Sequence, residues 1–308
     1  MRALRRTSTV AVAVGTSVLL SGCAGLGSTV EQGRSGAGLT VLASFYPLQY
    51  VAEKVGGDRV EVTPLTPPGA EPHDLELSPR QVREVGDADV VLYLAGFQPA
   101  VDDAVAARDP KHLLDAARTP AVAEHLGEPT GTDDGHGDAD PHFWLDPTLL
   151  AAVAQDVAVV LGEADPAHAD TYAENAQTLA DDLDELDAEI SNGLATCERR
   201  VLVTAHEAFG FLAERYDLEQ VGISGLEPES EPSPARLREI REVVTEHGVT
   251  TVFTEALLNP KVSQTVAGDL GVRTAVLDPV ESQVDPATDY RGAMDLNLAA
   301  LREALGCT

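Results

Sequence analysis

Three histidines and one aspartate of this chain stand where a side chain could be presented to a metal ion. His142 lies between two Asp-Pro steps in the segment 138–147, and the residue before a proline is driven into extended backbone. His73 lies in the segment 69–74 just after a Pro/Gly turn, His206 in the segment 202–207, and Asp278 at the end of the run 275–279. Imidazole suits zinc and other borderline metals, while a carboxylate adds charge and tolerates manganese. We therefore predict that these four side chains meet around one metal ion.

The elements that must position them alternate between strand and helix, which is typical of an α/β fold with parallel sheets. In open α/β sheets ligands bind at the carboxyl ends of the strands. His73, His206 and Asp278 all follow predicted strands. The strands are expected at 40–46, 60–65, 90–94, 201–204, 220–224, 250–255 and 273–277. The shorter helices are expected at 47–56, 78–86, 100–107, 147–162, 206–216, 233–247, 260–270 and 290–305.

A long helix is expected from Pro166 to Leu194, with apolar residues at steps of three and four on one face and acidic residues on the other. Its 29 or so residues would span roughly 43 Å, longer than one domain needs. We interpret it as a rigid linker helix between two α/β lobes, with the metal site in the cleft between them. The expected division is a lobe at 39–163, the linker at 164–196 and a lobe at 197–308; a coiled-coil dimer is the alternative for the helix.

The N-terminus has the pattern of a lipoprotein signal peptide at 1–22, with three arginines before an apolar stretch too short to span a membrane. The segment ending at Cys23 resembles the bacterial lipobox, in which the cysteine carries the lipid. A flexible Gly/Ser-rich tether, 23–38, would follow. These features predict an extracytoplasmic protein, lipid-anchored to the cell membrane without spanning it. The alternative is an ordinary secretory signal that happens to contain a cysteine.

The charge of the chain is strongly negative. Its 21 basic and 51 acidic residues give −30, and removing the three signal arginines gives −33. This charge excludes nucleic acid as a partner, because nucleic-acid binding requires a basic face. The negative charge favours the binding of cations. The alternative is that the acidic surface only keeps the protein soluble. An acidic, Gly-rich loop at 127–140 contains His136 and is either a solvated linker or an accessory lip that gathers metal.

Beyond Cys23 the chain has only Cys197 and Cys307. In an oxidising compartment two cysteines suggest one disulfide, which could stabilise by roughly 4–5 kcal/mol in the chain-entropy model. Two free thiols are the alternative.

Four segments together resemble the ligand segments of the zinc/manganese substrate-binding lipoproteins of ABC transporters, over roughly residues 40–308. They are EPHDLELSP at 71–79, DPHFWLDP at 140–147, TAHEAFG at 204–210 and LDP at 277–279. The resemblance implies two lobes joined by one long helix around a buried metal, with His73, His142, His206 and Asp278 as ligands. Manganese-selective members tend to have Glu at the third position, so His206 favours zinc. Glu255 matches a strand end near the family's site, as a second-shell group or alternative ligand.

The resemblance implies capture of Zn²⁺, with Mn²⁺ as the other candidate, and delivery to a membrane permease for uptake, by a protein expected to be a monomer. Three histidines and one carboxylate would fill a tetrahedral zinc shell and leave no place for a reactive water. The alternatives are a manganese-binding protein or adhesin of the same fold, and a secreted zinc hydrolase using Asp278 or Glu255 as base. The chain lacks an HExxH motif, and unlike many zinc members it has a single histidine, His136, in its acidic loop.

Overall fold

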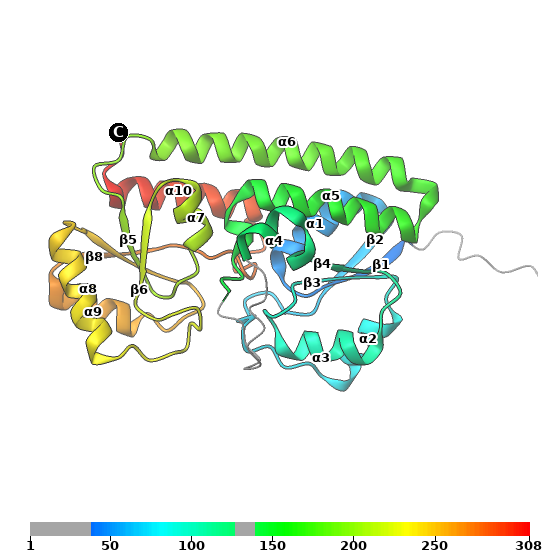
Figure 1. Cartoon of the computed structure of the whole chain (residues 1–308), viewed down its shortest axis with the longest axis horizontal. Helices are drawn as coiled ribbons and strands as arrows, with labels where there is room; N and C mark the ends of the chain where they lie inside the picture. Colours follow the sequence, from blue (N-terminus) through cyan, green and yellow to red (C-terminus); the bar gives the residue numbers. More distant parts are fainter. Residues whose placement is uncertain (1–37, 127–138) are drawn as a thin grey trace, which may run out of the picture. The chain divides into compact units, whose positions relative to one another are not determined.

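The structure, a computed structural model, describes residues 38–126 and 139–308, and Gly38–Thr308 forms one compact unit (Figure 1). The predicted signal peptide, the lipidation site at Cys23 and nearly all of the tether lie outside the described residues. The same holds for His136 and most of the acidic loop.

The first half of this unit contains a four-stranded parallel sheet in the order β2-β1-β3-β4. In Figure 1, α1, α4 and α5 lie on one side of this sheet and α2 and α3 on the other. Local sequence explains the helix starts: α2 begins with a capping box between Ser78 and Gln81, and its first residue is a proline. The strands are Leu39–Ala43 (β1), Val60–Pro64 (β2), Val90–Tyr93 (β3) and Leu113–Asp115 (β4). The helices are Tyr46–Gly56 (α1), Pro79–Asp87 (α2), Pro99–Arg108 (α3), Pro120–Leu126 (α4) and Pro147–Ala164 (α5).

The second half repeats this arrangement, with a parallel sheet in the order β6-β5-β7-β8. Each sheet thus places its first strand second in the order. The strands are Val201–Thr204 (β5), Glu219–Gly222 (β6), Thr251–Thr254 (β7) and Arg273–Val276 (β8). The helices are Gly210–Arg215 (α7), Pro234–Glu246 (α8), Lys261–Leu270 (α9) and Tyr290–Leu305 (α10).

The long helix α6, Ala169–Leu194, extends over both sheets and packs against α1, α5 and α10 (Figure 1). Its apolar stripe is buried as predicted, at Tyr172, Ala176, Leu179, Leu183, Leu186, Ile190 and Leu194. The expected architecture of two α/β lobes linked by one long helix is therefore confirmed. Beyond the carboxyl end of α6, Cys197 forms a disulfide with Cys307, the second residue after α10.

One described helix, α5, is long and apolar enough to cross a membrane by length and composition. However, 56% of it is buried inside the unit, where Leu149, Val153 and Leu161 belong to the main core. Its apolar character is accounted for by packing against α1 and α6.

The sequence prediction differs from the structure in three places. The strand β4 and the helix α4 were not predicted, because both are short. The predicted helix 206–216 begins only at Gly210, so His206 lies in a bend between β5 and α7. The predicted long helix starts with a separate 3₁₀ turn at Pro166–His168.

Candidate metal centre

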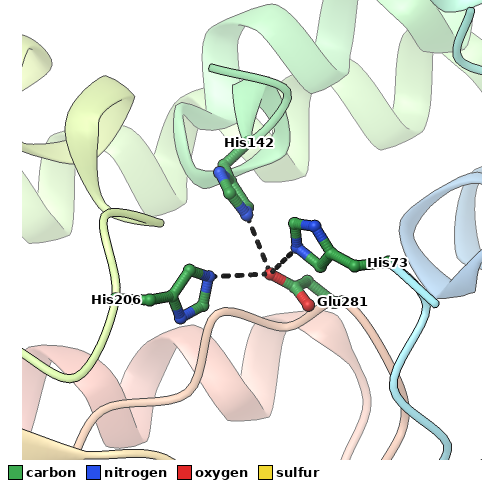
Figure 2. A group of neighbouring side chains, drawn as sticks. All are labelled: His73, His142, His206 and Glu281. Atoms are coloured by element: carbon green, nitrogen blue, oxygen red, sulfur yellow. Dashed lines mark ion pairs between the residues drawn. The ribbon is translucent and has the colours of Figure 1, made fainter. Parts of the chain in front are cut away.

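Four side chains from four separate segments converge between the two halves of the unit (Figure 2). His73 follows β2, His206 follows β5, and His142 directly precedes the 3₁₀ turn Phe143–Leu145. The fourth member is Glu281, which follows β8. One ligand atom from each lies within 4.8 Å of the others, and all four residues are buried. Loops that follow strands of the two sheets thus supply three of the four members, as parallel sheets predict, and the segment before α5 supplies His142.

The spacing of these atoms suits a tetrahedral ion. Oε1 of Glu281 lies 3.5 Å from Nε2 of His73, 2.9 Å from Nε2 of His142 and 3.5 Å from Nε2 of His206. A tetrahedral zinc with bonds of about 2.0–2.1 Å separates its ligands by roughly 3.3 Å. None of the four atoms has a hydrogen-bond partner of acceptable geometry among the described residues. A buried polar atom left unpaired costs about 1–3 kcal/mol, so four at one point indicate a site made for an ion.

Two of the three imidazoles are held by a carboxylate at their other nitrogen. Nδ1 of His142 lies 2.6 Å from Asp140 Oδ1, and Nδ1 of His206 lies 2.8 Å from Glu255 Oε1. Such a contact fixes the tautomer, turning Nε2 with its lone pair toward the centre. For His73 the described residues provide no carboxylate at Nδ1; its ring packs edge-on against Phe97, with centroids 4.8 Å apart.

The charges of the group are strongly coupled. Burial alone would raise the pKa of Glu281, yet the three imidazoles around it hold that pKa well below its usual range. Burial opposes a charge on His206, but Glu255 and Glu281 outweigh it and raise its pKa to about 10. The pKa of His142 is likewise raised, against burial, by Asp140 and Glu281. Without metal the group therefore retains protons, and a binding ion must displace them.

Asp278, predicted as the fourth ligand, is not a member of the group, and Glu281 takes that place. The side chain of Asp278 instead accepts a hydrogen bond from the backbone N–H of Val280, at 2.8 Å. The physical reason is that the chain turns at Val280, where φ is +56°. This turn brings Glu281, three positions after Asp278, to the histidines. The sequence shows Glu281 only as one more carboxylate near a strand end.

Glu255 contributes no atom to the group of four and contacts it through His206, so the second-shell alternative matches its place in the structure. Beside the group, the residues that line a small pocket include four acidic ones, Glu71, Glu255, Asp278 and Glu281. Burial and the nearby charge of Glu281 raise the pKa of Glu71 to about 7. The role of Asp140, which the sequence interpretation missed, could have been inferred from its place two residues before His142.

Comparisons with known proteins agree with this geometry. Residues 41–304 match the sequence profile of the family described as zinc-uptake complex component A, periplasmic. The chain is 31% identical over 277 residues to the zinc-binding lipoprotein AdcA of Streptococcus pneumoniae, covering 86% of this chain and 55% of AdcA. It thus spans about half the length of that relative. It is 28% identical over 300 residues to the high-affinity zinc uptake system protein ZnuA of Bacillus subtilis, covering 94% of each.

A similar solved structure is that of the laminin-binding protein Lmb of Streptococcus agalactiae, described as bifunctional with adhesin and metal-transporting activity. The TM-score is 0.74 at 32% identity, with 87% of this chain and all of that chain covered. The family profile extends from β1 almost to the end of α10 and so includes both sheets and all four members of the metal group. The chain belongs to the ZnuA family of zinc-uptake components.

Proposed function

We propose that this chain is an extracytoplasmic zinc-binding protein that delivers Zn²⁺ to the membrane permease of an ABC transporter. The observation that carries the proposal is the convergence of three buried imidazole nitrogens and one carboxylate oxygen within 4.8 Å. Four protein ligands complete a tetrahedral zinc shell, whereas catalytic zinc sites keep one position for water. The centre is therefore suited to capture and release, and the chain is a binding protein of an uptake family, not an enzyme.

Zinc is favoured over manganese by the donor set. Manganese prefers oxygen ligands in octahedral geometry, while imidazole-rich tetrahedral sites suit zinc. His206 supplies a third imidazole, and Glu281 is the only carboxylate in the group. The names of the relatives AdcA and ZnuA support the same metal. The adhesin activity in the description of Lmb is a property of that protein, and no contact described above favours it here.

The test is a calorimetric titration of the chelator-stripped protein, in a soluble form beginning at Ala24, with zinc and separately with manganese. We expect one zinc ion per chain at high affinity and much weaker manganese binding. Glu281→Gln removes the carboxylate with little change in volume and should weaken zinc binding by more than about 100-fold, above the usual effect of outer-shell groups. Glu242→Gln, an exposed residue on α8, is the matched control and should bind like the wild type.

Equal or stronger binding of manganese would overturn the metal assignment. Failure to bind either ion would overturn the centre itself, and wild-type zinc affinity in Glu281→Gln would show that Glu281 is not a ligand. His206→Glu, which installs the residue typical of manganese-selective members, should narrow the difference between the two metals.

The anchoring and organisation of the chain are also part of the proposal. We propose that residues 1–22 are removed, that Cys23 carries the lipid, and that the mature monomer has lobes at 39–163 and 197–308 with the linker at 164–196. The two separate sheets, with the long helix between them in sequence, support this division. Cys23→Ser should abolish incorporation of a labelled fatty acid into the protein, and labelling of that variant would contradict lipidation at Cys23.

A further inference from the structure

The residue before Glu281 has a backbone conformation that its side chain disfavours. Val280 has φ of +56°, in the left-handed region that β-branched residues rarely adopt. Its side chain is 1% exposed, so the residue is enclosed by neighbours. A strained conformation of this kind persists only where the surroundings impose it, and such residues gather at ligand sites. The turn at 278–281 therefore needs groups that hold it.

On the side toward α10, the turn is held through Asp278. The Asp278 carboxylate accepts the N–H of Val280 at 2.8 Å. The backbone of Asp278 is itself fixed by Asn297 of α10, whose Oδ1 accepts the Asp278 N–H at 2.8 Å and whose Nδ2 donates to the Asp278 carbonyl at 2.7 Å. Asn297 is 3% exposed. The two bonds to Asn297 hold the backbone of Asp278 in place. The third bond lets the Asp278 carboxylate restrain Val280.

On the opposite side, the turn is held by the first half of the unit. Nε1 of Trp144 donates to the carbonyl of Pro279 at 2.7 Å, and the N–H of Tyr46 donates to the carbonyl of Glu281 at 3.3 Å. The backbone on both sides of Val280 is thus anchored. The bond between Asp278 and Val280 closes the turn between these anchors and so determines where the Glu281 side chain begins.

We propose that Asp278 is a positioning residue for the metal centre: its carboxylate holds the strained turn at Val280 so that Glu281 faces the three histidines. The proposal rests on the function proposed above, because the effect is on metal binding. What the role requires is an oxygen that accepts the Val280 N–H, not a negative charge and not a bond to the metal. A role as the ligand itself requires the carboxylate.

Three substitutions separate these requirements. Asp278→Asn and Asp278→Ser each keep an oxygen that can accept the Val280 N–H, since both residue types form such local turns. Asp278→Ala removes it. In the full chain purified in detergent, zinc affinity measured by competition with a chelator should fall roughly 10–100-fold for Asp278→Ala, the range for groups that orient metal ligands. The Asn and Ser variants should stay within a few-fold of the wild type.

A spectroscopic readout distinguishes positioning from general destabilisation. The protein loaded with Co²⁺ in place of zinc should show the visible absorption of a four-coordinate site in the wild type and in Asp278→Asn. In Asp278→Ala, as in Glu281→Gln, that absorption should change because a water replaces the carboxylate. The midpoint of thermal unfolding of each metal-free variant serves as the folding control.

Wild-type affinity and spectrum in a folded Asp278→Ala protein would overturn the positioning role. If Asp278→Asn and Asp278→Ser lose as much zinc affinity as Glu281→Gln, the positioning role is also overturned. Asp278 would then be a metal ligand. If Asp278→Ala fails to fold, the Asn and Ser variants decide alone. Failure of the wild type to bind zinc would instead contradict the proposed function, so the two failures are distinguishable.

Discussion

The two halves of the unit meet in two places that differ in chemistry. One is the metal centre, where four buried polar atoms have no hydrogen-bond partner among the described residues. The other we call the α6 seam: the buried apolar face of Ala169–Leu194 with α1, α5 and α10, together with the disulfide beyond its end. A fully buried leucine or isoleucine contributes about 1.5–3 kcal/mol, whereas each unpaired polar atom costs about 1–3 kcal/mol.

The difference shows how a carrier can bind an ion tightly and still exist without it. The α6 seam holds the halves together by apolar burial that does not depend on metal. The metal centre can then hold its four buried donor atoms close together without metal, and an arriving ion displaces the protons that the group retains. We expect stability and affinity to respond to different substitutions.

The largest effect on stability should come from breaking the disulfide at the α6 seam. Cys197 and Cys307 are 110 residues apart, and a loop of that length corresponds to roughly 4–5 kcal/mol in the chain-entropy model. The double substitution Cys197→Ser with Cys307→Ser should lower the free energy of unfolding by that order, measured by denaturant titration of the metal-free protein. Its zinc affinity should match the wild type. A parallel loss of affinity would show that the two places are not independent.

Binding of zinc at the metal centre should change the free energy of unfolding by about as much as the disulfide does. At free zinc about 1,000-fold above the dissociation constant, a ligand that binds only the folded state adds about 4 kcal/mol to the free energy of unfolding. Thermal unfolding with and without zinc measures this gain. Glu281→Gln should abolish the gain while the metal-free variant stays folded, because the α6 seam is intact. Unfolding of the metal-free variant at ordinary temperature would contradict the division of roles.

A smaller effect should follow from loosening one imidazole. Glu255→Gln keeps an acceptor for Nδ1 of His206 but removes the charge, so zinc affinity should fall about tenfold, at the low end for outer-shell groups. The substitution makes His206 more like His73, for which the described residues provide no carboxylate at Nδ1. The matched control is Glu207→Gln, since Glu207 adjoins His206 in sequence but pairs with Arg236 at 2.9 Å. If Glu255→Gln and Glu207→Gln lose zinc affinity equally, Glu255 makes no specific contribution to zinc binding.

The smallest effect concerns the pH dependence of an ion pair between α6 and α7, which lies outside the apolar α6 seam. Asp187 of α6 accepts two hydrogen bonds from Arg215 of α7, at 2.8 and 2.6 Å, and this partner lowers the pKa of Asp187. A carboxylate with a lowered folded pKa stabilises above its unfolded pKa of about 3.9, and the contribution disappears as pH falls through the folded value. The difference in unfolding midpoint between wild type and Asp187→Asn should therefore be present at pH 7 and vanish at strongly acidic pH. If the difference in unfolding midpoint stays the same at all pH values, the charge of Asp187 does not contribute to stability.

Much of this arrangement could be predicted from residue patterns. The apolar stripe of α6 follows from spacings of three and four, and most strands were placed to within about two residues. His73 and His206 were recognised as following strands, and His142 from its two flanking Asp-Pro steps. These features are local, and periodicity or proline chemistry determines them directly.

The fourth ligand could not be predicted in the same way. Asp278 and Glu281 are carboxylates in one short segment, and which of them faces the histidines depends on the turn at Val280. Valine normally avoids φ near +56°, so the sequence gives no signal for that turn. The backbone on both sides of Val280 is hydrogen-bonded to Asn297, Trp144 and Tyr46, which are distant in sequence. The family resemblance pointed to Glu255 near the site, but residue patterns did not show that it pairs with His206, 49 residues away.

The two hydrogen bonds between Asn297 and the backbone of Asp278 have a consequence for how the protein is made. Glu281 emerges during synthesis before α10, but the turn that aims it is held by a residue of that last helix, and Tyr290 at its start donates to the Trp144 carbonyl at 2.6 Å. A chain interrupted before residue 290 would contain all four ligands and still lack the frame that orients one of them. We therefore expect a chain that ends before residue 290 to bind zinc more weakly than the full chain, because Asn297 and Tyr290 would be missing.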